Sequence, residues 1–351
     1  MERTDKGKPL SVQMKRHSQK EVKKKPLYDG DMEQVISTGS TLLDLEISGG
    51  RIHGGGVPSG ILVEIFGPPG CGKTVVLCEI AGALQRLGGE VSFKDPEARL
   101  NKQFAKMFDL NTDNMDYTTP DTVTKVFSEI RNWKPENPKA INGIFTDSLA
   151  ALSTDLEMDN EDGDKMGMRR AKEFSEELRK TCRELQSKNY LLVCSNQVRQ
   201  KHNASKYENK YISPGGEAIG FYSSLRLRCS PPQKIKVERT ISGKKLKKVV
   251  GVTTYIEVFK SSIWKPYGVA PLTILLDYGI DDIRQNLQFI KDYTTATTYM
   301  IGDDRLSGTM EEAIQLIEEH DLVNELKEEV INLWEKIQSE FSSNRKEKGR
   351  S

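Results

Sequence analysis

The chain is poor in cysteine and histidine, with five cysteines and four histidines among 351 residues. The cysteines, at positions 71, 78, 182, 194 and 229, show no paired spacing. Disulfide frameworks and zinc clusters both rely on closely spaced, recurring ligands, so this distribution argues against either. Cys78, Cys182 and Cys194 fall in apolar periodic stretches, which is typical of thiols packed in a core.

Long apolar runs are also missing. No run approaches the roughly 18 residues of a membrane span, and no apolar core of the kind found in signal peptides follows the basic N-terminus. We therefore expect a cytoplasmic protein without a membrane partner. Apolar residues make up 36% of the chain, which is enough for one large domain and a smaller one.

The net charge is small, at +1, but the charges are unevenly distributed along the chain. Residues 1–25 contain nine Lys or Arg against three Asp or Glu, and residues 234–248 contain seven against one. The region 311–340 is instead rich in acidic residues. Basic segments of this kind favour surfaces that meet a polyanion. A solvated tail and a solvated hairpin are the alternative interpretation.

Strand-like and helix-like segments alternate through the middle of the chain. We expect strands at 61–66, 90–93, 141–147 and 190–196, and helices at 75–87 and 169–188. Apolar strands alternating with helices indicate an α/β fold with a mostly parallel central sheet covered on both faces. Two further strands joined at Ser242-Gly243 predict a hairpin that extends the sheet. Beyond about residue 277 the chain is polar and helical, with Leu326, Val330, Leu333, Trp334, Ile337 and Phe341 on one helix face.

The segment GPPGCGKT fits the pattern G-x-x-x-x-G-K-[ST] and lies between a predicted strand and a predicted helix. Its residues are Gly67, Pro68, Pro69, Gly70, Cys71, Gly72, Lys73 and Thr74. The glycines let backbone N–H groups surround phosphate oxygens, and the helix N-terminus adds partial positive charge. We expect Lys73 to reach the β- and γ-phosphates of ATP and Thr74 to ligate Mg²⁺. The alternative is a Gly/Pro-rich turn that matches by chance.

Two acidic residues at predicted strand ends complete the expected ATP site. Asp147 ends the strand 141–147 beside the phosphate loop and fits the Walker B role of holding Mg²⁺ through water. The alternative for Asp147 is a helix cap. Glu97 follows the strand 90–93 and is placed to orient or activate the attacking water. Asp95 is its local competitor, and a plain surface turn is the alternative.

A long basic segment, SNQVRQKHNASKYENKYISPGGEAIG, leaves the strand 190–196 at the sheet edge where the nucleotide is expected. A structureless loop of this length is typically functional or disordered. Gln197 at its start is placed to touch the γ-phosphate, its cations to meet DNA phosphates, and Tyr207 or Tyr211 to stack on bases. A second segment, 157–173, follows Asp147 and carries Arg169, Arg170 and Lys172. The two loops predict a DNA groove, and flexible surface insertions are the alternative.

Together these motifs resemble the RecA recombinase family over about Val35 to Phe341. The matching stretches are ISTGSTLLD, VEIFGPPGCGKT, FKDPEARLNKQFAKMFDLNTDNM, DSLAAL, MGMRRA, NQVRQK with GGEAIGFYSSLRL, and VVGVTTYIEVFKSSIWKPYG. The resemblance implies a RecA-like P-loop ATPase that forms a helical filament on single-stranded DNA and pairs it with homologous duplex DNA. The expected partners are therefore single- and double-stranded DNA and further copies of the chain, with loading or mediator proteins as further candidates.

The resemblance also implies roles for individual residues. Glu97 is expected to be the catalytic glutamate, acting with Lys73 and the nucleotide sensor Gln197. Phe104 falls on an adenine-stacking aromatic, and Lys260 on a lysine that reaches the ATP of a neighbouring subunit. The residues assigned to DNA contacts are Met166, Arg169, Arg170, Lys172, Arg179, Arg199, Lys201, Tyr207, Gly215 and Gly216.

The expected organisation is a basic N-terminal arm or oligomerisation segment at 1–34, a RecA-like ATPase and DNA-binding core at 35–276, a small α+β C-terminal domain at 277–341 and a disordered tail at 342–351. The sequence departs from the family pattern at Glu217, where an Asn would contact DNA, and at Ser262, where a second lysine is usual. Such divergence is compatible with a phage or mobile-element member. Two other functions stay open, a hexameric helicase or AAA-like motor and a nucleotide-gated DNA-binding filament that hydrolyses ATP weakly.

Overall fold

The computed structural model describes residues 32–154, 166–200, 211–212, 217–343 and 345. Contacts divide the chain after Glu33, and residues Gln34–Ser351 form one compact unit. The predicted boundary near residue 276 therefore stays a prediction. Within the described ranges, no helix is both long enough and apolar enough to cross a membrane.

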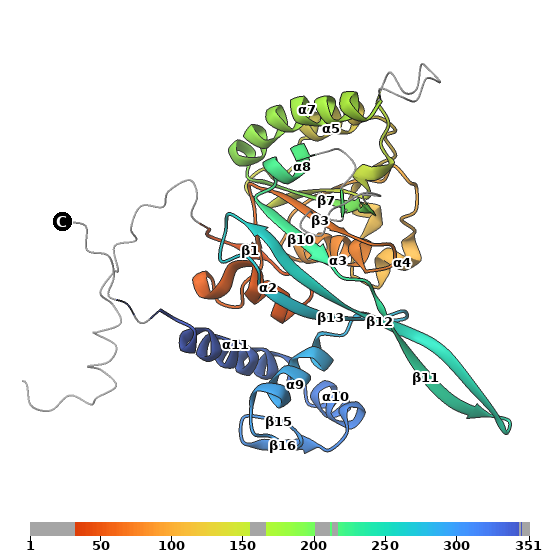
Figure 1. The fold of residues 1–351 in the computed structure, drawn as a ribbon, viewed down its shortest axis with the longest axis vertical. Helices are drawn as coiled ribbons and strands as arrows, with labels where there is room; N and C mark the ends of the chain where they lie inside the picture. Colours follow the sequence, from red (N-terminus) through yellow and green to blue (C-terminus); the bar gives the residue numbers. More distant parts are fainter. Residues whose placement is uncertain (1–31, 155–165, 201–210, 213–216, 344, 346–351) are drawn as a thin grey trace, which may run out of the picture. The chain divides into compact units, whose positions relative to one another are not determined.

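A large mixed sheet forms the centre of this unit (Figure 1). The parallel part runs in the order β10, β3, β7, β6, β4, β5, so that the chain crosses over repeatedly. The bounds of these strands are β3 Leu62–Gly67, β4 Val91–Lys94, β5 Asp116–Thr118, β6 Asn142–Thr146, β7 Tyr190–Gln197 and β10 Leu225–Cys229. Strands β3, β4 and β6 are buried throughout, which confirms the parallel sheet expected from their apolar runs.

Helices cover both faces of the parallel strands. Helix α3 (Lys73–Arg86) packs on β3, β4, β6 and β7. Helices α7 (Met166–Lys188), α8 (Glu217–Tyr222) and α5 (Val123–Asn132) cover the other face, with α5 packed against α7. The second face has its own core, in which Phe127 and Phe174 meet edge to face with ring centroids 6.0 Å apart. The carboxyl ends of all these parallel strands therefore lie at one edge of the sheet.

The antiparallel part of the sheet continues from β10 through β12 (Lys244–Ser261), β13 (Val269–Leu275) and β14 (Gly279–Ile280). The first half of β12 leaves the sheet and pairs with β11 (Gln233–Ile241) as a two-stranded ribbon. Ser242 and Gly243, with φ of 50° and 77°, form the tip. Positive φ at both positions is the geometry of a type I′ turn, whose twist matches that of the strands. The predicted hairpin is thus confirmed.

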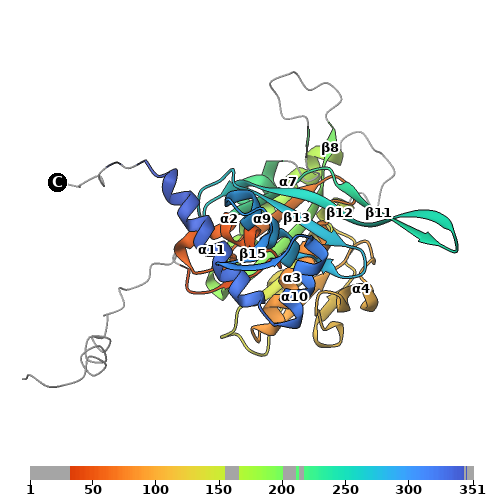
Figure 2. The ribbon, with the colours of Figure 1, turned by 90° about the horizontal axis from the view of Figure 1, so that it is seen from below.

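The C-terminal region packs on α2 (Thr41–Ser48) and β13 through α9 (Asp282–Tyr293) and α11 (Val323–Glu340). The periodic residues Leu326 and Val330 are fully buried, and the Trp334 indole donates to Glu46 Oε1 at 2.9 Å. Phe341, expected on the same face, is instead 83% exposed, because α11 has already ended at Glu340. Figure 2 shows α9, α10 (Met310–Glu319) and α11 grouped with the strand β15 (Tyr299–Ile301).

Short elements complete the described chain. They are β1 (Val35–Ile36) with β2 (Val57–Pro58), β8 (Arg199–Gln200) with β9 (Tyr211–Ile212), the strand β16 (Asp304–Ser307), the helix α4 (Lys102–Lys106), and the 3-10 turns η1 (Gly49–Arg51), η2 (Thr112–Asn114) and η3 (Leu149–Ala151).

Candidate ATP-binding and catalytic site

The phosphate-loop segment lies between β3 and α3, in the strand–loop–helix context that the sequence predicted. Gly70 and Gly72 have φ of 73° and 91°, a backbone conformation that side chains rarely allow. At Gly72 a Cβ atom would also lie 2.3 Å from Ile274 Cδ1, and at Gly67 one would lie 2.8 Å from the Cys229 carbonyl oxygen. The loop therefore needs glycine at these positions for its conformation and its close packing.

Lys73 and Thr74 begin α3 and face the loop. The Lys73 ammonium donates to the carbonyl oxygens of Gly67 and Pro68 at 3.1 and 2.9 Å. The Cys71 side chain is buried, so this residue can offer a phosphate only its backbone N–H. Its Sγ lies 3.8 Å from the Lys73 nitrogen, and a hydrogen bond with Cys229 lowers the pKa of the Cys71 thiol to about 7.

Asp147 follows the end of β6 and is held by two hydroxyl groups. Thr74 Oγ1 donates to Asp147 Oδ2 at 2.6 Å, and Ser195 Oγ donates to Asp147 Oδ1. Burial raises the pKa of the Asp147 carboxyl, while these two hydrogen bonds act in the opposite direction. Asp147 thus lies beside the phosphate loop, where a Walker B carboxylate is expected, and does not act as a helix cap through its side chain.

The donor set at this position suits Mg²⁺. A hydroxyl and a carboxylate are hard oxygen ligands, and Mg²⁺ usually takes one or two carboxylates while keeping water and phosphate oxygens. Among the described residues, no group of three or more acidic, histidine or cysteine side chains forms a metal cluster. The Thr74–Asp147 pair fits a metal that arrives with a nucleotide.

Glu97 and its competitor Asp95 differ in their surroundings. Asp95 is buried and accepts hydrogen bonds from the Leu100 N–H and the Tyr117 hydroxyl at 2.8 and 2.9 Å, which makes it a structural residue of the turn. Glu97 accepts from Ser148 Oγ at 3.1 Å and lies 2.7 Å from the Arg99 guanidinium. Its side chain lines the cavity beside the phosphate loop. The geometry therefore favours Glu97 over Asp95 as the residue that orients or activates the attacking water.

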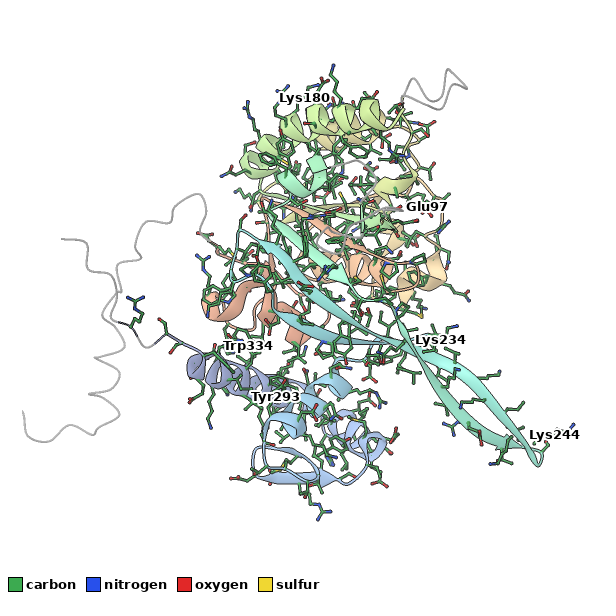
Figure 3. All side chains as sticks on the ribbon, viewed as in Figure 1. Glu97, Lys180, Lys234, Lys244, Tyr293 and Trp334 are labelled. Atoms are coloured by element: carbon green, nitrogen blue, oxygen red, sulfur yellow. The ribbon has the colours of Figure 1, made fainter. Side chains whose placement is uncertain are left out.

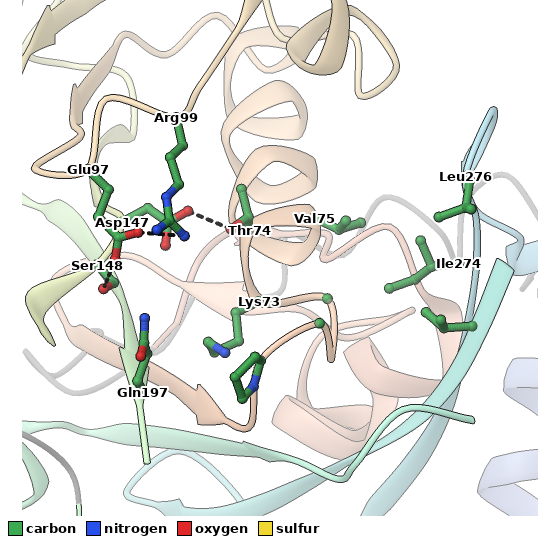
Figure 4. A pocket seen from close by; sticks show the side chains of 14 residues that line it. Lys73, Thr74, Val75, Glu97, Arg99, Asp147, Ser148, Gln197, Ile274 and Leu276 are labelled. Atoms are coloured by element: carbon green, nitrogen blue, oxygen red, sulfur yellow. Dashed lines mark hydrogen bonds and ion pairs between the residues drawn. The ribbon is translucent and has the colours of Figure 1, made fainter. Parts of the chain in front are cut away.

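These groups line one cavity of about 340 Å³ (Figure 4). Lys73, Thr74, Glu97, Asp147 and Gln197 reach it from four different elements or loops. Its other wall is apolar and is formed by Val252 of β12, Ile274 of β13 and Leu276, which follows β13. Sequence reasoning missed that wall and the roles of Ser148 and Ser195, because these contacts join stretches far apart in the chain. It also missed Arg99, which pairs with the nearby Glu97.

Two residues with predicted nucleotide roles lie elsewhere. Phe104 is on α4 and meets Phe108 edge to face, with ring centroids 4.9 Å apart, and it is not among the residues that line the cavity. Lys260 is on β12, and its ammonium donates to the carbonyl oxygens of Gly220 and Phe221 at 2.9 Å each. Burial and the neighbouring Arg226 lower the pKa of Lys260. Adenine stacking by Phe104 and a contact of Lys260 with a neighbouring subunit stay predictions.

The predicted DNA-binding residues are described only in part. Lys172 and Arg179 are exposed on α7, whereas the Arg170 guanidinium turns inward and donates to the carbonyl oxygens of Leu149 and Ala150 at 3.2 and 2.9 Å. The backbone of Arg199 lies in β8. The side chains of Met166, Arg169 and Arg199 and the residues Lys201, Tyr207, Gly215 and Gly216 lie outside the described residues. Their DNA contacts stay predictions.

Comparison with known proteins decides the family. The family model described as the RecA N-terminal domain matches residues 15–281. The chain belongs to the RecA family. It is 32% identical over 299 residues to Protein RecA of Borrelia hermsii, covering 84% of this chain and 80% of that protein. It is 33% identical to Protein RecA of Borrelia turicatae over 84% of this chain and 78% of the relative, and 30% identical to that of Symbiobacterium thermophilum over 82% and 79%.

As a RecA family member, the chain is an ATP-dependent DNA recombinase with DNA-dependent ATPase activity. The helicase and AAA-like alternatives are not favoured. The phosphate loop expected from the sequence lies within residues 15–281, which the family model matches, and several of its residues line the cavity of Figure 4.

Proposed function

We propose that this RecA family member hydrolyses Mg²⁺-bound ATP in the cavity beside the phosphate loop and uses the nucleotide to control a helical filament on single-stranded DNA. The filament then pairs its strand with homologous duplex DNA. The observation that carries the proposal is the convergence of Lys73, Thr74, Asp147 and Glu97 on one cavity at the carboxyl edge of the sheet.

Each of these side chains has a distinct role in the proposal. The glycines of the phosphate loop and the N-terminus of α3 bind the phosphates, and Lys73 turns from the loop carbonyls to the γ-phosphate. Thr74 and Asp147 would hold Mg²⁺, and the bound ion would supply positive charge beside the phosphate oxygens. Glu97 accepts the proton of the attacking water.

The apolar wall supports a further assignment within the same cavity. Ile274 is buried and lines the cavity on the side away from Glu97 and Asp147 (Figure 4). The partly buried Val252 also lines the cavity. An adenine base gains stability from apolar surface of this kind. In the proposal the base packs against these residues, and Phe104 adds a contact from a separate element.

Residues at the ends of β7 and β12 link the nucleotide cavity to DNA binding in this proposal. Gln197 ends β7 in the cavity and directly precedes the basic loop, so a contact of Gln197 with the γ-phosphate would order that loop. Lys260 bonds to the carbonyl oxygens near the end of α8, the helix that follows the same loop. In an assembled filament Lys260 would exchange these partners for the nucleotide of the neighbouring subunit.

Electron microscopy of the protein with single-stranded DNA and ATP tests the proposal, together with a strand-exchange assay on homologous DNA. We expect helical filaments and joint molecules that depend on ATP, and neither with Lys73→Ala. Closed rings, or strand exchange that Lys73→Ala leaves at the wild-type level, would contradict the proposal.

A further inference from the structure

The ribbon formed by β11 and the first half of β12 projects away from the sheet in both ribbon views (Figures 1 and 2). Every residue from 238 to 249 is exposed. The nine residues of β11 are joined by eight steps of about 3.4 Å, so the strand spans about 27 Å. A two-stranded ribbon without a core is marginal by itself, so its length calls for a reason outside the fold.

Cations occupy both faces of this ribbon. Residues directly opposite each other in an antiparallel pair share a face, and side chains alternate along each strand. The register therefore assigns Lys234, Lys236, Lys245 and Lys247 to one face, and Arg239, Lys244 and Lys248 to the other. All seven are exposed, from Lys234 near the base to Lys244 at the tip (Figure 3). The only acidic residue of the ribbon, Glu238, lies 3.3 Å from Lys245.

We propose that the β11–β12 ribbon is a DNA-binding arm whose partner is duplex DNA, held through phosphates of both strands. Duplex DNA carries one negative charge per about 1.7 Å of its axis, and the major groove, about 12 Å wide, admits a two-stranded β-ribbon. A ribbon with cations on both faces can meet phosphates on both sides of a groove. Cations confined to one face would instead suit a flat surface.

The residue types on the ribbon distinguish duplex DNA from a single strand. Proteins that hold single strands combine cations with aromatic side chains on which the bases stack. Residues 233–253 contain no Phe, Tyr or Trp. The exposed apolar residues are instead Ile241, Leu246 and Val249, at 57%, 47% and 39% exposure. Aliphatic side chains contact base edges and sugars in a groove but offer no stacking surface.

The base of the ribbon adjoins the nucleotide cavity. Val252 on β12 pairs with Lys234 at the base of the ribbon and lines the cavity. A Cβ atom at Gly70 of the phosphate loop would lie 4.0 Å from Pro232, which precedes β11. Duplex DNA on the arm would therefore lie next to the site of ATP hydrolysis. The inference deepens the proposed function, since homologous pairing requires a duplex, and it rests on that function for its biological role only.

A different role for the cations is protection of an edge strand. Lysines on exposed edges prevent pairing with another chain. Edge protection requires charge but no ligand, so neutral ribbon variants would associate with one another and keep their affinity for DNA. A second copy of the chain with an acidic surface is another candidate partner. In that case neutral ribbon variants would lose self-association and keep their DNA binding.

The test compares DNA binding by the full-length wild type and three variants without nucleotide. Lys244→Gln/Lys245→Gln/Lys247→Gln/Lys248→Gln removes four ribbon charges, and the same four positions changed to Arg restore them. A matched control, Lys106→Gln/Lys134→Gln/Lys139→Gln/Lys336→Gln, removes four exposed charges elsewhere. Fluorescence anisotropy measures the affinity for a duplex of about 30 base pairs and a single strand of the same length, from about 50 to 200 mM salt. Thermal melting and sedimentation check folding and association.

We expect the Gln ribbon variant to bind the duplex at least about tenfold more weakly, with a slope of log affinity against log salt reduced by about 3 to 4. Its single-strand binding should change little, and the Arg variant should bind like the wild type. Duplex binding equal to that of the matched control would overturn the inference. Equal losses for both DNA forms, or a change in self-association alone, would overturn it as well. Wild-type protein that binds neither DNA form would instead refute the proposed function.

Discussion

Replacing Glu97 with Gln separates water activation from nucleotide binding at the cavity. The substitution keeps the shape of the side chain and an oxygen that accepts the Ser148 hydrogen bond, which is 3.1 Å long in the structure. It removes the negative charge that lies 2.7 Å from the Arg99 guanidinium and the group that we assign as proton acceptor. Phosphate binding by Lys73 and Thr74 should be preserved.

The expected magnitude follows from comparing these two losses. A general base contributes about 10²- to 10⁴-fold to a rate, which is about 3 to 5 kcal/mol of barrier. The Arg99 side chain is 76% exposed, so its ion pair with Glu97 is worth about 0 to 1 kcal/mol, or at most about fivefold. Glu97→Gln should therefore lower the turnover number at least about 100-fold, and Arg99→Ala no more than about fivefold.

The assay is ATP turnover with saturating single-stranded DNA, accompanied by equilibrium binding of a fluorescent ATP analogue. Glu97→Gln should bind the analogue with wild-type affinity, remain on DNA with ATP and turn over slowly. Turnover within fivefold of the wild type would refute the role of Glu97. The same slow turnover in Asp95→Asn, with folding and analogue binding intact, would mean that the other acid is the base.

Three further predictions follow from the same contacts. Lys260→Ala should bind nucleotide as a monomer but lose DNA-stimulated ATP hydrolysis. Mixing Lys260→Ala with Glu97→Gln should restore ATP hydrolysis in co-assembled filaments, because some subunit junctions then have both groups intact. No recovery at any mixing ratio would count against a site shared between subunits. Arg226→Ala should lower the unfolding free energy by about 3 to 5 kcal/mol in denaturant titrations, because it leaves the fully buried Glu64 without the guanidinium that lies 2.6 Å away. The control Arg228→Ala, from a more exposed pair, should cost about 0 to 1 kcal/mol beyond lost packing. Burial raises the pKa of Asp44 to about 7, so the folded state retains a proton that the unfolded state releases, and wild-type stability should fall as pH rises from about 4 to 7. In Asp44→Asn this fall in unfolding free energy should shrink by up to about 4 kcal/mol. A pH profile of stability that is the same in the variant would contradict the raised pKa of Asp44.

The phosphate loop and its flanking elements were predictable because the signals are local. A continuous apolar run, a glycine pattern and a helical period follow one another within residues 61–87, and β3, the loop and α3 appear there. Asp147 and Gln197 were predictable for the related reason that parallel strands end at one edge. Their positions in the cavity required no knowledge of tertiary contacts beyond that rule.

The choice between Asp95 and Glu97 could not be made from the sequence. Both follow the same strand, and only the hydrogen bonds of Asp95 with the Leu100 N–H and the Tyr117 hydroxyl identify it as structural. Ser195 shows the same difficulty, because its hydroxyl meets Asp147 across 48 residues of chain. Such partners depend on strand order, which periodicity does not contain.

The apolar wall and the C-terminal helix mark further boundaries of sequence reasoning. Ile274 lines the cavity because β13 pairs with β12, and β12 pairs with β10 at the edge of the parallel strands. This strand order depends on antiparallel pairings that the local sequence pattern does not specify. In α11, helical spacing identified Leu326 and Val330 as buried but also included Phe341, which lies one residue past the end of the helix. Spacing alone does not tell where a helix stops.

In the proposed function, one cavity couples ATP hydrolysis to DNA. The most direct measurement is the steady-state rate of ATP hydrolysis by wild type and Lys73→Ala, each with and without single-stranded DNA. We predict that DNA stimulates the wild-type rate and that Lys73→Ala, which removes the cation beside the phosphate loop, loses on the order of 100-fold or more of the stimulated rate. A wild-type rate that does not respond to DNA, or near-normal turnover in Lys73→Ala, would show that this cavity does not couple ATP hydrolysis to DNA.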